Sequence, residues 1–225
     1  MTWVKLCGTT DLHDAELSVA AGTDALGFIF APSPRRIAIA EAAEIIARLP
    51  DGIEKIGVFV NQTPAHVAEV AQQAGLSGVQ LHGDEPVEQM SEFRRALGER
   101  RIIKTLQARD ILKAPERLAE YLAARGSIDA ILLDSGSALQ RGGTGTPFAW
   151  QEVAPFAAAV RAAMPLIVAG GLNPQNVAKA IQLFAPWGVD VVSGVESEPG
   201  TKDEARLRDF VAAVRHTQAS AKLRE

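Results

Sequence analysis

IGVFVNQTPAHVAEVAQQAGLSGVQL, at residues 56–81, contains two short apolar runs separated by one amphipathic segment. The runs at residues 56–60 and 78–81 are too short for stable helices and are nearly continuous in apolar residues, as buried parallel strands are. Between them, residues 64–74 begin with Pro64 in the first turn and stop at Gly75, which are the usual start and stop signals of a helix. The stretch therefore predicts a strand, a helix and a second strand parallel to the first.

The same alternation extends along the chain in both directions. Further strands are predicted at residues 4–7, 25–30, 102–105, 130–133, 166–168 and 189–192, and further helices at 11–21, 40–49, 86–97, 115–125, 150–163, 174–184 and 202–216. Asp11 and Asn173 are the expected N-caps of two of these helices. Strict alternation demands parallel strands joined by crossover helices, and in this length it fits a closed barrel better than an open doubly wound sheet. We therefore predict an α/β fold, a single-domain (β/α)₈ TIM barrel with eight parallel strands.

The predicted domain organisation is simple. No linker rich in Gly, Ser or Pro divides the chain of 225 residues, and 47% of them are hydrophobic, which is enough for a substantial core. Residues 1–217 are the predicted barrel domain, and residues 218–225 are a predicted C-terminal tail that frays.

Composition also restricts partners and location. The net charge of −4 argues against nucleic acid or an anionic membrane as the main partner. No apolar run approaches the roughly 20 residues that span a bilayer. The single cysteine, Cys7, allows no disulfide within the chain, and the first residues do not resemble a signal peptide. We expect a cytoplasmic protein; the sequence leaves the oligomeric state open, with a monomer as the expectation.

Polar residues gather where the predicted strands end. In barrels of this kind the active site lies at the carboxyl ends of the strands, in the loops that follow. The residues expected around that mouth are Cys7, Arg35, Asn61, His82, Lys104, Asp134, Gly170, Gly171, Ser193 and Gly194.

Two glycine-containing loops predict a phosphate site. Gly170 and Gly171 follow the seventh predicted strand, and Ser193 and Gly194 follow the eighth. Glycine lets backbone N–H groups approach an anion closely, and these two loops bind phosphate in many barrels. Either pair alone is equally compatible with a tight strand-to-helix turn, but together they favour phosphate.

Cys7 and Asp134 are the candidates for proton transfer. Cys7 ends the first predicted strand and Asp134 directly follows the sixth, and the two are expected to face each other across the mouth. Lys5 lies two residues before Cys7, on the same side of the strand, where a cation favours the thiolate. The alternatives are an inert, buried Cys7 and an Asp134 that caps its own loop.

Two arginines and a long loop flank this mouth. Arg35 and Arg36 follow the second predicted strand, and a guanidinium held there is suited to gripping a substrate carboxylate, although surface arginines are the alternative. Residues 135–147 form a long, glycine-rich loop that is a candidate lid.

No metal and no cofactor are expected. His13, His66 and His216 fall in predicted helices, only His82 ends a strand, and no two histidines have the spacing of a zinc site. The sequence has no G-x-G-x-x-G after a strand and no G-x-x-x-x-G-K-[ST], so nicotinamide, flavin and nucleoside triphosphate binding are not indicated.

Nine segments, in order and each near a predicted strand end, resemble the phosphoribosylanthranilate isomerases of tryptophan biosynthesis. They lie at residues 4–10, 27–30, 33–35, 57–61, 79–85, 132–135, 142–145, 170–174 and 191–196. The Lys-x-Cys-Gly and Gln-Leu-His-Gly pieces, at residues 5–8 and 80–83, are the most telling, and the resemblance covers nearly the whole chain.

The resemblance implies an Amadori rearrangement of N-(5-phosphoribosyl)anthranilate to 1-(2-carboxyphenylamino)-1-deoxyribulose 5-phosphate without a cofactor. It implies Asp134 as the general acid, Cys7 as the general base and Arg35 as the ligand of the anthranilate carboxylate, with Arg36 as the alternative. The substrate-binding positions that it implies are Lys5, Arg35, Gln80, His82, Gly143, Gly170, Gly171, Ser193 and Gly194.

Two other functions remain open at this point. One is another sugar-phosphate epimerase, synthase or aldolase on the same barrel; an aldolase needs a lysine nucleophile, for which Lys104 is the candidate. The other is a barrel that only binds a phosphorylated ligand or forms a subunit interface.

Overall fold

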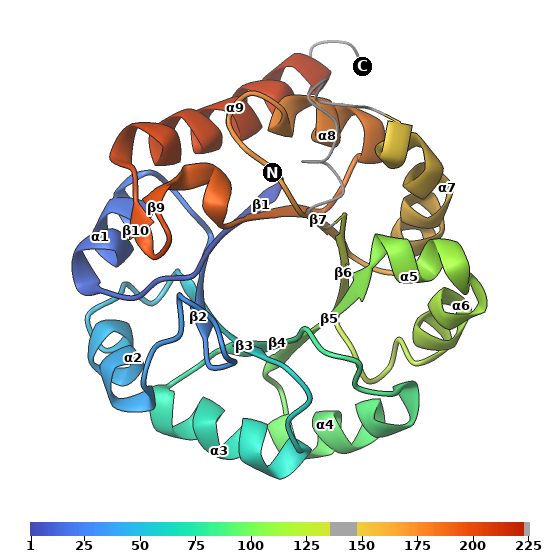
Figure 1. The fold of residues 1–225 in the computed structure, drawn as a ribbon, viewed down its shortest axis with the longest axis horizontal. Helices are drawn as coiled ribbons and strands as arrows, with labels where there is room; N and C mark the ends of the chain where they lie inside the picture. The colour runs from blue at the N-terminus through green and yellow to red at the C-terminus, as the bar shows by residue number, and fades with distance from the viewer. Residues whose placement is uncertain (136–147, 223–225) are drawn as a thin grey trace.

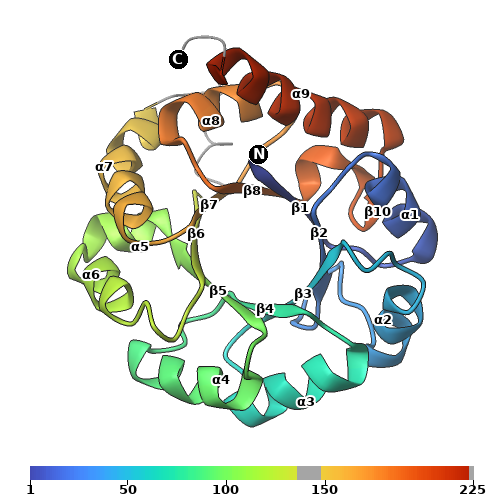
Figure 2. The ribbon, with the colours of Figure 1, turned by 180° about the vertical axis from the view of Figure 1, so that it is seen from behind.

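The computed structural model describes residues 1–135 and 148–222, and the side chains of residues 1–135 and 150–217. Eight parallel strands close into a barrel in chain order, β1 to β8, and the helices surround it (Figures 1 and 2). The predicted single (β/α)₈ barrel is confirmed.

The barrel strands are β1 (Trp3–Cys7), β2 (Ala25–Ile29), β3 (Glu54–Phe59), β4 (Gly78–Leu81), β5 (Arg101–Gln107), β6 (Ala130–Asp134), β7 (Leu166–Ala169) and β8 (Gly188–Val191). The α-helices are α1 (Leu12–Ala20), α2 (Ile39–Ile46), α3 (Pro64–Ala74), α4 (Met90–Leu97), α5 (Ala108–Lys113), α6 (Glu116–Ala123), α7 (Phe148–Ala163), α8 (Val177–Phe184) and α9 (Glu204–Lys222). Two short 3₁₀ helices, η1 (Val87–Gln89) and η3 (Ser193–Val195), and a small hairpin of β9 (Glu196–Glu198) and β10 (Thr201–Lys202) complete the described elements.

Local signals explain where α3 begins and ends. The Thr63 hydroxyl accepts a hydrogen bond from the His66 N–H at 3.3 Å, and Pro64 occupies the first turn, where its missing N–H costs nothing. Gly75 ends the helix in the left-handed region, at φ 73°. Both bounds of this helix agree with the prediction.

Other connections differ from the prediction. The short α5 and the β9–β10 hairpin were not predicted. The α8 helix starts at Val177, because the Asn173 side chain accepts hydrogen bonds from the N–H groups of Gln175 and Asn176 and forms a turn before the helix. The α9 helix continues to Lys222, past the predicted end at residue 216. The division of the chain into a domain and a tail at residue 217 stays a prediction.

Two apolar layers explain why the strands are hydrophobic on both faces. The larger layer lies between the outer face of the barrel and the helices, and includes Leu6, Phe28 and Phe93. The smaller layer fills the barrel interior, with Ile103 and Leu132 among its members. Each strand therefore reads as a nearly continuous apolar run, as in other parallel sheets.

An aromatic and charged cluster closes the end of the barrel where the strands begin. The rings of Trp3 and Trp187 stack with centroids 5.1 Å apart, and the Arg101 guanidinium lies 5.0 Å from the Trp187 ring centroid. Glu54 binds both the indole N–H of Trp3 and Nε of Arg101, at 3.0 and 2.8 Å. This plug leaves the opposite mouth as the open end of the barrel.

Within the described residues, no helix combines the length and apolar character needed to cross a membrane.

Candidate functional site

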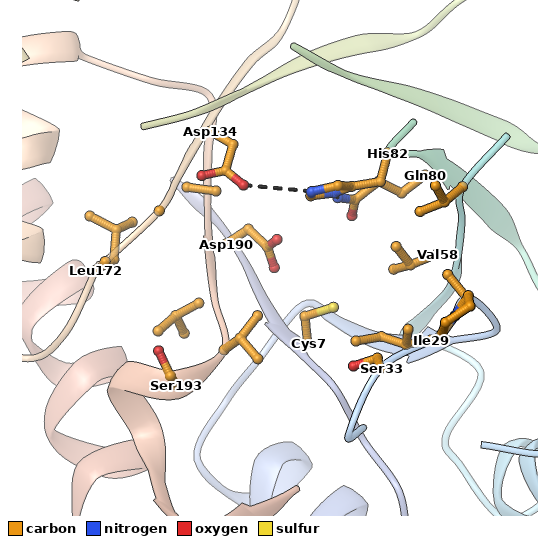
Figure 3. Close-up of a pocket in the computed structure, with 18 residues that line it drawn as sticks. Cys7, Ile29, Ser33, Val58, Gln80, His82, Asp134, Leu172, Asp190 and Ser193 are labelled. Carbon is orange, nitrogen blue, oxygen red and sulfur yellow. Dashed lines mark hydrogen bonds and ion pairs between the residues drawn. The ribbon is translucent and has the colours of Figure 1, made fainter. Parts of the chain in front are cut away.

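A pocket of about 470 Å³ opens at the carboxyl ends of the strands (Figure 3). This volume is typical of small-molecule sites. The pocket is lined by Cys7 from β1, Gln80 and His82 at β4, Asp134 from β6, Asp190 from β8 and Ser193. Residues from four separate parts of the chain thus converge on one cavity, as the predicted ring of strand ends requires.

Cys7 is the last residue of β1 and contributes its thiol to the pocket wall. Gly27 lies opposite it on β2, and a Cβ there would approach the sulfur to 2.4 Å, so glycine makes room for the thiol. Burial raises the pKa of Cys7, and the opposing effect of Lys5 is too small to reverse it. Lys5 therefore acts in the predicted direction, but the thiol and not the thiolate is favoured.

Lys5 lies below the pocket, fully buried, and does not line it. Its ammonium donates to Asp190 Oδ1 and to Gln80 Oε1, both at 2.9 Å. Burial alone lowers the pKa of Lys5, but the nearby Asp190 carboxylate and Cys7 sulfur leave the pKa above its ordinary value. Lys5 is thus a permanent cation beneath the floor of the pocket.

Gln80, His82 and Asp134 continue this polar chain upward. Gln80 Nε2 lies 2.9 Å from His82 Nδ1, and His82 Nε2 lies 3.6 Å from Asp134 Oδ2. Gln107 Nε2 also donates to Asp134 Oδ2, at 3.4 Å. Burial lowers the pKa of His82 despite the opposing effect of Asp134. The imidazole is therefore neutral at neutral pH.

Lys104 is held away from this pocket. Its ammonium lies 2.7 Å from Glu85 Oε2 and 2.7 Å from the Gly83 carbonyl oxygen. It contacts a second cavity, of about 520 Å³, which shares His82 and Asp134 with the first. Burial lowers its pKa, although Glu85 opposes this effect. The ammonium supports the loop after β4, and this role disfavours Lys104 as a nucleophile.

The loops after β7 and β8 meet on one side of the pocket. Gly170 and Gly171, at φ 90° and 64°, line it together with Ser193. Gly194 lies behind this wall, where a Cβ would stand 1.9 Å from the Leu172 carbonyl oxygen. Only glycine at position 194 permits this contact between the two loops.

Arg35 lies beside the pocket and not in its lining. Its Nε and Nη2 atoms donate to the two carboxylate oxygens of Glu196, at 2.8 and 2.6 Å. Lys202 donates to the same carboxylate at 3.2 Å and to the Cys7 carbonyl oxygen at 2.6 Å. Arg36 is exposed. The two adjacent arginines thus differ in their surroundings: Glu196 holds Arg35 beside the pocket, whereas Arg36 is exposed.

The predictions still to be compared with the structure concern Gly143, the lid loop and a metal site. Gly143 and the predicted lid from residue 136 onward lie outside the described residues. Within the described ranges, no three His, Cys, Asp or Glu side chains form a group that could hold a metal ion.

Asp190, Glu196 and Lys202 belong to the site but were not predicted from the sequence. Asp190 carried a usable signal, because a carboxylate within a buried apolar strand demands a partner, and Lys5 on β1 is the matching cation. Glu196 and Lys202 gave no such signal, since they lie in an unpredicted hairpin.

Comparisons with known proteins agree over nearly the whole chain. The family model of N-(5′-phosphoribosyl)anthranilate (PRA) isomerase matches residues 4–213. A Geobacter sulfurreducens protein named N-(5′-phosphoribosyl)anthranilate isomerase is 47% identical over 212 residues, which are 94% of this chain and 97% of that protein. One from Rubrobacter xylanophilus is 42% identical over 217 residues, which are 96% of this chain and 100% of that protein.

Solved structures give the same result. The phosphoribosyl anthranilate isomerase of Thermotoga maritima is similar with a TM-score of 0.80 and 38% identity, covering 96% of this chain and 100% of that one. A phosphoribosyl anthranilate isomerase in complex with reduced 1-(o-carboxyphenylamino)-1-deoxyribulose 5-phosphate has a TM-score of 0.77 and 36% identity, with the same coverage. With the family model and these relatives in agreement, the chain belongs to the N-(5′-phosphoribosyl)anthranilate isomerase family.

Proposed function

We infer that this chain isomerises N-(5′-phosphoribosyl)anthranilate to 1-(2-carboxyphenylamino)-1-deoxyribulose 5-phosphate, in tryptophan biosynthesis. The family and the names of its relatives support this reaction. The observation that carries it is that the Cys7 thiol and the Asp134 carboxyl line one pocket, beside the glycine-containing loops after β7 and β8. A thiol and a carboxyl flanking a bound sugar are the minimum set for moving protons in this isomerisation.

The proposed steps use one acid and one base. Asp134 protonates the ring oxygen of the ribose, and the bond from C1′ to that oxygen breaks to give an open-chain iminium ion. Cys7, as the thiolate, takes the proton from C2′, and the electrons that are released give a neutral enolamine. The enolamine loses the proton on O2′ and gains one at C1′ to form the ketone. Substrate and product contain the same atoms, so no other reactant is needed.

Two anchors are proposed for the ends of the substrate. Gly170, Gly171, Ser193 and Gly194 supply the phosphate site, and Arg35 binds the anthranilate carboxylate. Glu196 occupies the Nε and Nη2 edge of Arg35, which fixes the plane of the guanidinium while leaving Nη1 for a ligand. Anchoring both ends holds the sugar between acid and base and lowers the entropic cost of reaching the reactive geometry.

Replacing Gly194 with alanine is expected to weaken phosphate binding by about tenfold or more, because the Cβ would collide with the Leu172 carbonyl and separate the two loops. The measurement is the dissociation constant of the reduced product analogue, with inorganic phosphate as competitor. Gly126→Ala is the matched control, since a Cβ there meets no atom within 4 Å. Equal affinities in the two variants would remove the β8 loop from the phosphate site.

Replacing Arg35 with alanine is expected to raise KM by about 10- to 100-fold, the effect of losing a charge-assisted contact to a carboxylate. Arg36→Ala, which removes an exposed guanidinium one residue away, should leave KM within about twofold of the wild type. Inhibition by inorganic phosphate should be nearly equal in both variants. Equal increases of KM in the two variants would leave the carboxylate without an assigned partner.

The function itself is tested by following the fluorescence of phosphoribosylanthranilate with purified protein. The signal should disappear with turnover, and the product should be the carboxyphenylamino deoxyribulose phosphate. Stable fluorescence together with tight binding of the substrate would favour a binding protein instead. Borohydride trapping of substrate on Lys104 would favour an aldolase. The burial of that lysine in an ion pair with Glu85 argues against this outcome.

Three expectations of the sequence stay predictions. They are a cytoplasmic location, a monomer, and the absence of nucleic acid or membrane partners. The single cysteine supports the first and the acidic charge balance supports the third.

A further inference from the structure

Lys5, Gln80 and His82 are linked in sequence by hydrogen bonds beneath the pocket. The ammonium group of Lys5 fixes which atom donates in each of these bonds. An ammonium group has three donors and no acceptor. Lys5 Nζ lies 2.9 Å from the amide oxygen of Gln80, and Gln80 is 1% exposed. If the amide were reversed, its NH₂ group would face the ammonium. The Gln80 oxygen must therefore face Lys5, and its nitrogen must face the other way.

The Gln80 nitrogen then determines which ring nitrogen of His82 carries a proton. An amide NH₂ group has two donors and no acceptor. Its partners are Thr105 Oγ1 at 3.1 Å and His82 Nδ1 at 2.9 Å. His82 Nδ1 must accept this bond and can carry no proton. A neutral imidazole without a proton on Nδ1 carries it on Nε2, the nitrogen 3.6 Å from Asp134 Oδ2.

We propose that Lys5, acting through Gln80, holds His82 as the neutral tautomer protonated on Nε2, so that His82 directs a donor at Asp134 and transfers no proton itself. Gln80 and Lys5 are then positioning residues. Figure 3 shows His82 directed across the pocket at Asp134, with the contact between them drawn as a dashed line. The part of this proposal that concerns Asp134 rests on the proposed function, whereas the tautomer does not.

A donor from His82 has a defined effect on the carboxyl group. When Oδ2 accepts a hydrogen bond, the acid proton belongs on Oδ1, where it is available to the substrate. The same donor stabilises the carboxylate after the proton has left. The separation of 3.6 Å exceeds a hydrogen bond, so a closing movement of several tenths of an ångström is needed to form it.

The charges around His82 are balanced. Asp134 on β6 and Asp190 on β8 favour the imidazolium, whereas Lys5 on β1 and Lys104 on β5 oppose it. Burial also opposes the charged form. Protonation of Nδ1 would in addition set its N–H against the Gln80 NH₂ group. Every one of these groups except the two carboxylates favours a neutral His82.

The tautomer can be read directly by nitrogen NMR of the protein labelled with ¹⁵N-histidine. The chain has four histidines, and the His82→Gln variant assigns the His82 signals by their loss. We expect His82 Nδ1 at the shift of an unprotonated ring nitrogen and Nε2 at that of a protonated one, unchanged from about pH 6 to 8. A protonated Nδ1, or an imidazolium at neutral pH, would overturn the proposal without any measurement of activity.

Gln80→Glu tests the role of the amide. A carboxylate at position 80 can only accept, so it requires a proton on His82 Nδ1. We expect the Nδ1 signal of this variant to move to that of a protonated nitrogen. Gln72→Glu, on the exposed surface of α3, is the matched control and should leave the spectrum unchanged. An unchanged His82 spectrum in Gln80→Glu would contradict the proposed coupling, and if that variant fails to fold, the wild-type spectrum still decides the tautomer.

Two variants of His82 separate donation from proton transfer. His82→Gln keeps a neutral N–H donor and should retain kcat within about tenfold, whereas His82→Leu should lose about 10- to 100-fold, as for a lost hydrogen bond to a charged group. Equal losses in both would overturn the donor role. The expected tautomer in a protein without isomerase activity would contradict the proposed function alone.

Discussion

Replacing Asp134 with asparagine should lower kcat by about 10²–10⁴-fold, the usual contribution of a general acid. Asparagine has nearly the same shape, and its amide oxygen can still accept from the N–H groups of His82 and Gln107 that face Asp134 Oδ2. The variant therefore keeps the pocket but has no proton to give. Steady-state kinetics and the affinity for the reduced product analogue separate these two properties, and the affinity should change little.

The control for Asp134 is Asp110→Asn, which removes a carboxylate from the neighbouring cavity only. Its kcat should stay close to that of the wild type. Activity of Asp134→Asn within a few-fold of the wild type would remove Asp134 from the proton transfers. A parallel loss of analogue affinity would instead make Asp134 an anchor for the substrate.

Replacing Cys7 with serine should also lower kcat by about 10²–10⁴-fold, because the base that takes the C2′ proton is lost. A serine hydroxyl is a far weaker acid than a thiol, so it supplies almost no anion near neutral pH. Gly27 leaves space beside position 7, and the smaller oxygen should fit without displacing β2. Analogue affinity and the thermal midpoint should therefore stay close to the wild-type values.

Protonation of the Cys7 sulfur predicts that the reactivity of this residue in the wild type depends on pH. Burial raises the pKa of Cys7 above the ordinary value, so the thiol is the main form at neutral pH. The thiolate is the form that reacts with an alkylating reagent such as iodoacetamide, so the rate of alkylation of Cys7 should rise as the pH increases above neutrality. Cys7→Ser, which leaves the chain without a cysteine, should lack this reaction. An alkylation rate that does not change between about pH 7 and 9 would contradict a raised pKa of the Cys7 thiol.

The fold could be predicted because its signals are local. The strand at residues 78–81 and the helix Pro64–Ala74 depend on apolar runs, Pro64 and Gly75, all of which the sequence displays. The α5 helix was missed because its six residues are too few for a periodic pattern. Its position after β5 comes from packing, which no window of sequence shows.

The candidate site was partly predictable for a different reason. Strand ends meet at one mouth of a parallel barrel, so Cys7, His82 and Asp134 could be placed together from their positions alone. The partners of the charged groups could not be predicted from position along the chain. Arg35 and Glu196 are 161 residues apart in the chain, and their pairing exists only after closure of the barrel. The direction in which the pKa of the Cys7 thiol shifts could not be predicted either, because it depends on how deeply the sulfur is buried.

The central claim is that a thiol and a carboxyl act on the same bound sugar from within one pocket. A crystal structure of this protein with the reduced product analogue tests it most directly. We expect the Cys7 sulfur beside C2′, the Asp134 carboxyl at the oxygen that closes the ribose ring in the substrate, and the phosphate against Gly171 and Ser193. An analogue bound only in the neighbouring cavity, or with its sugar carbons out of reach of the Cys7 sulfur, would contradict the claim.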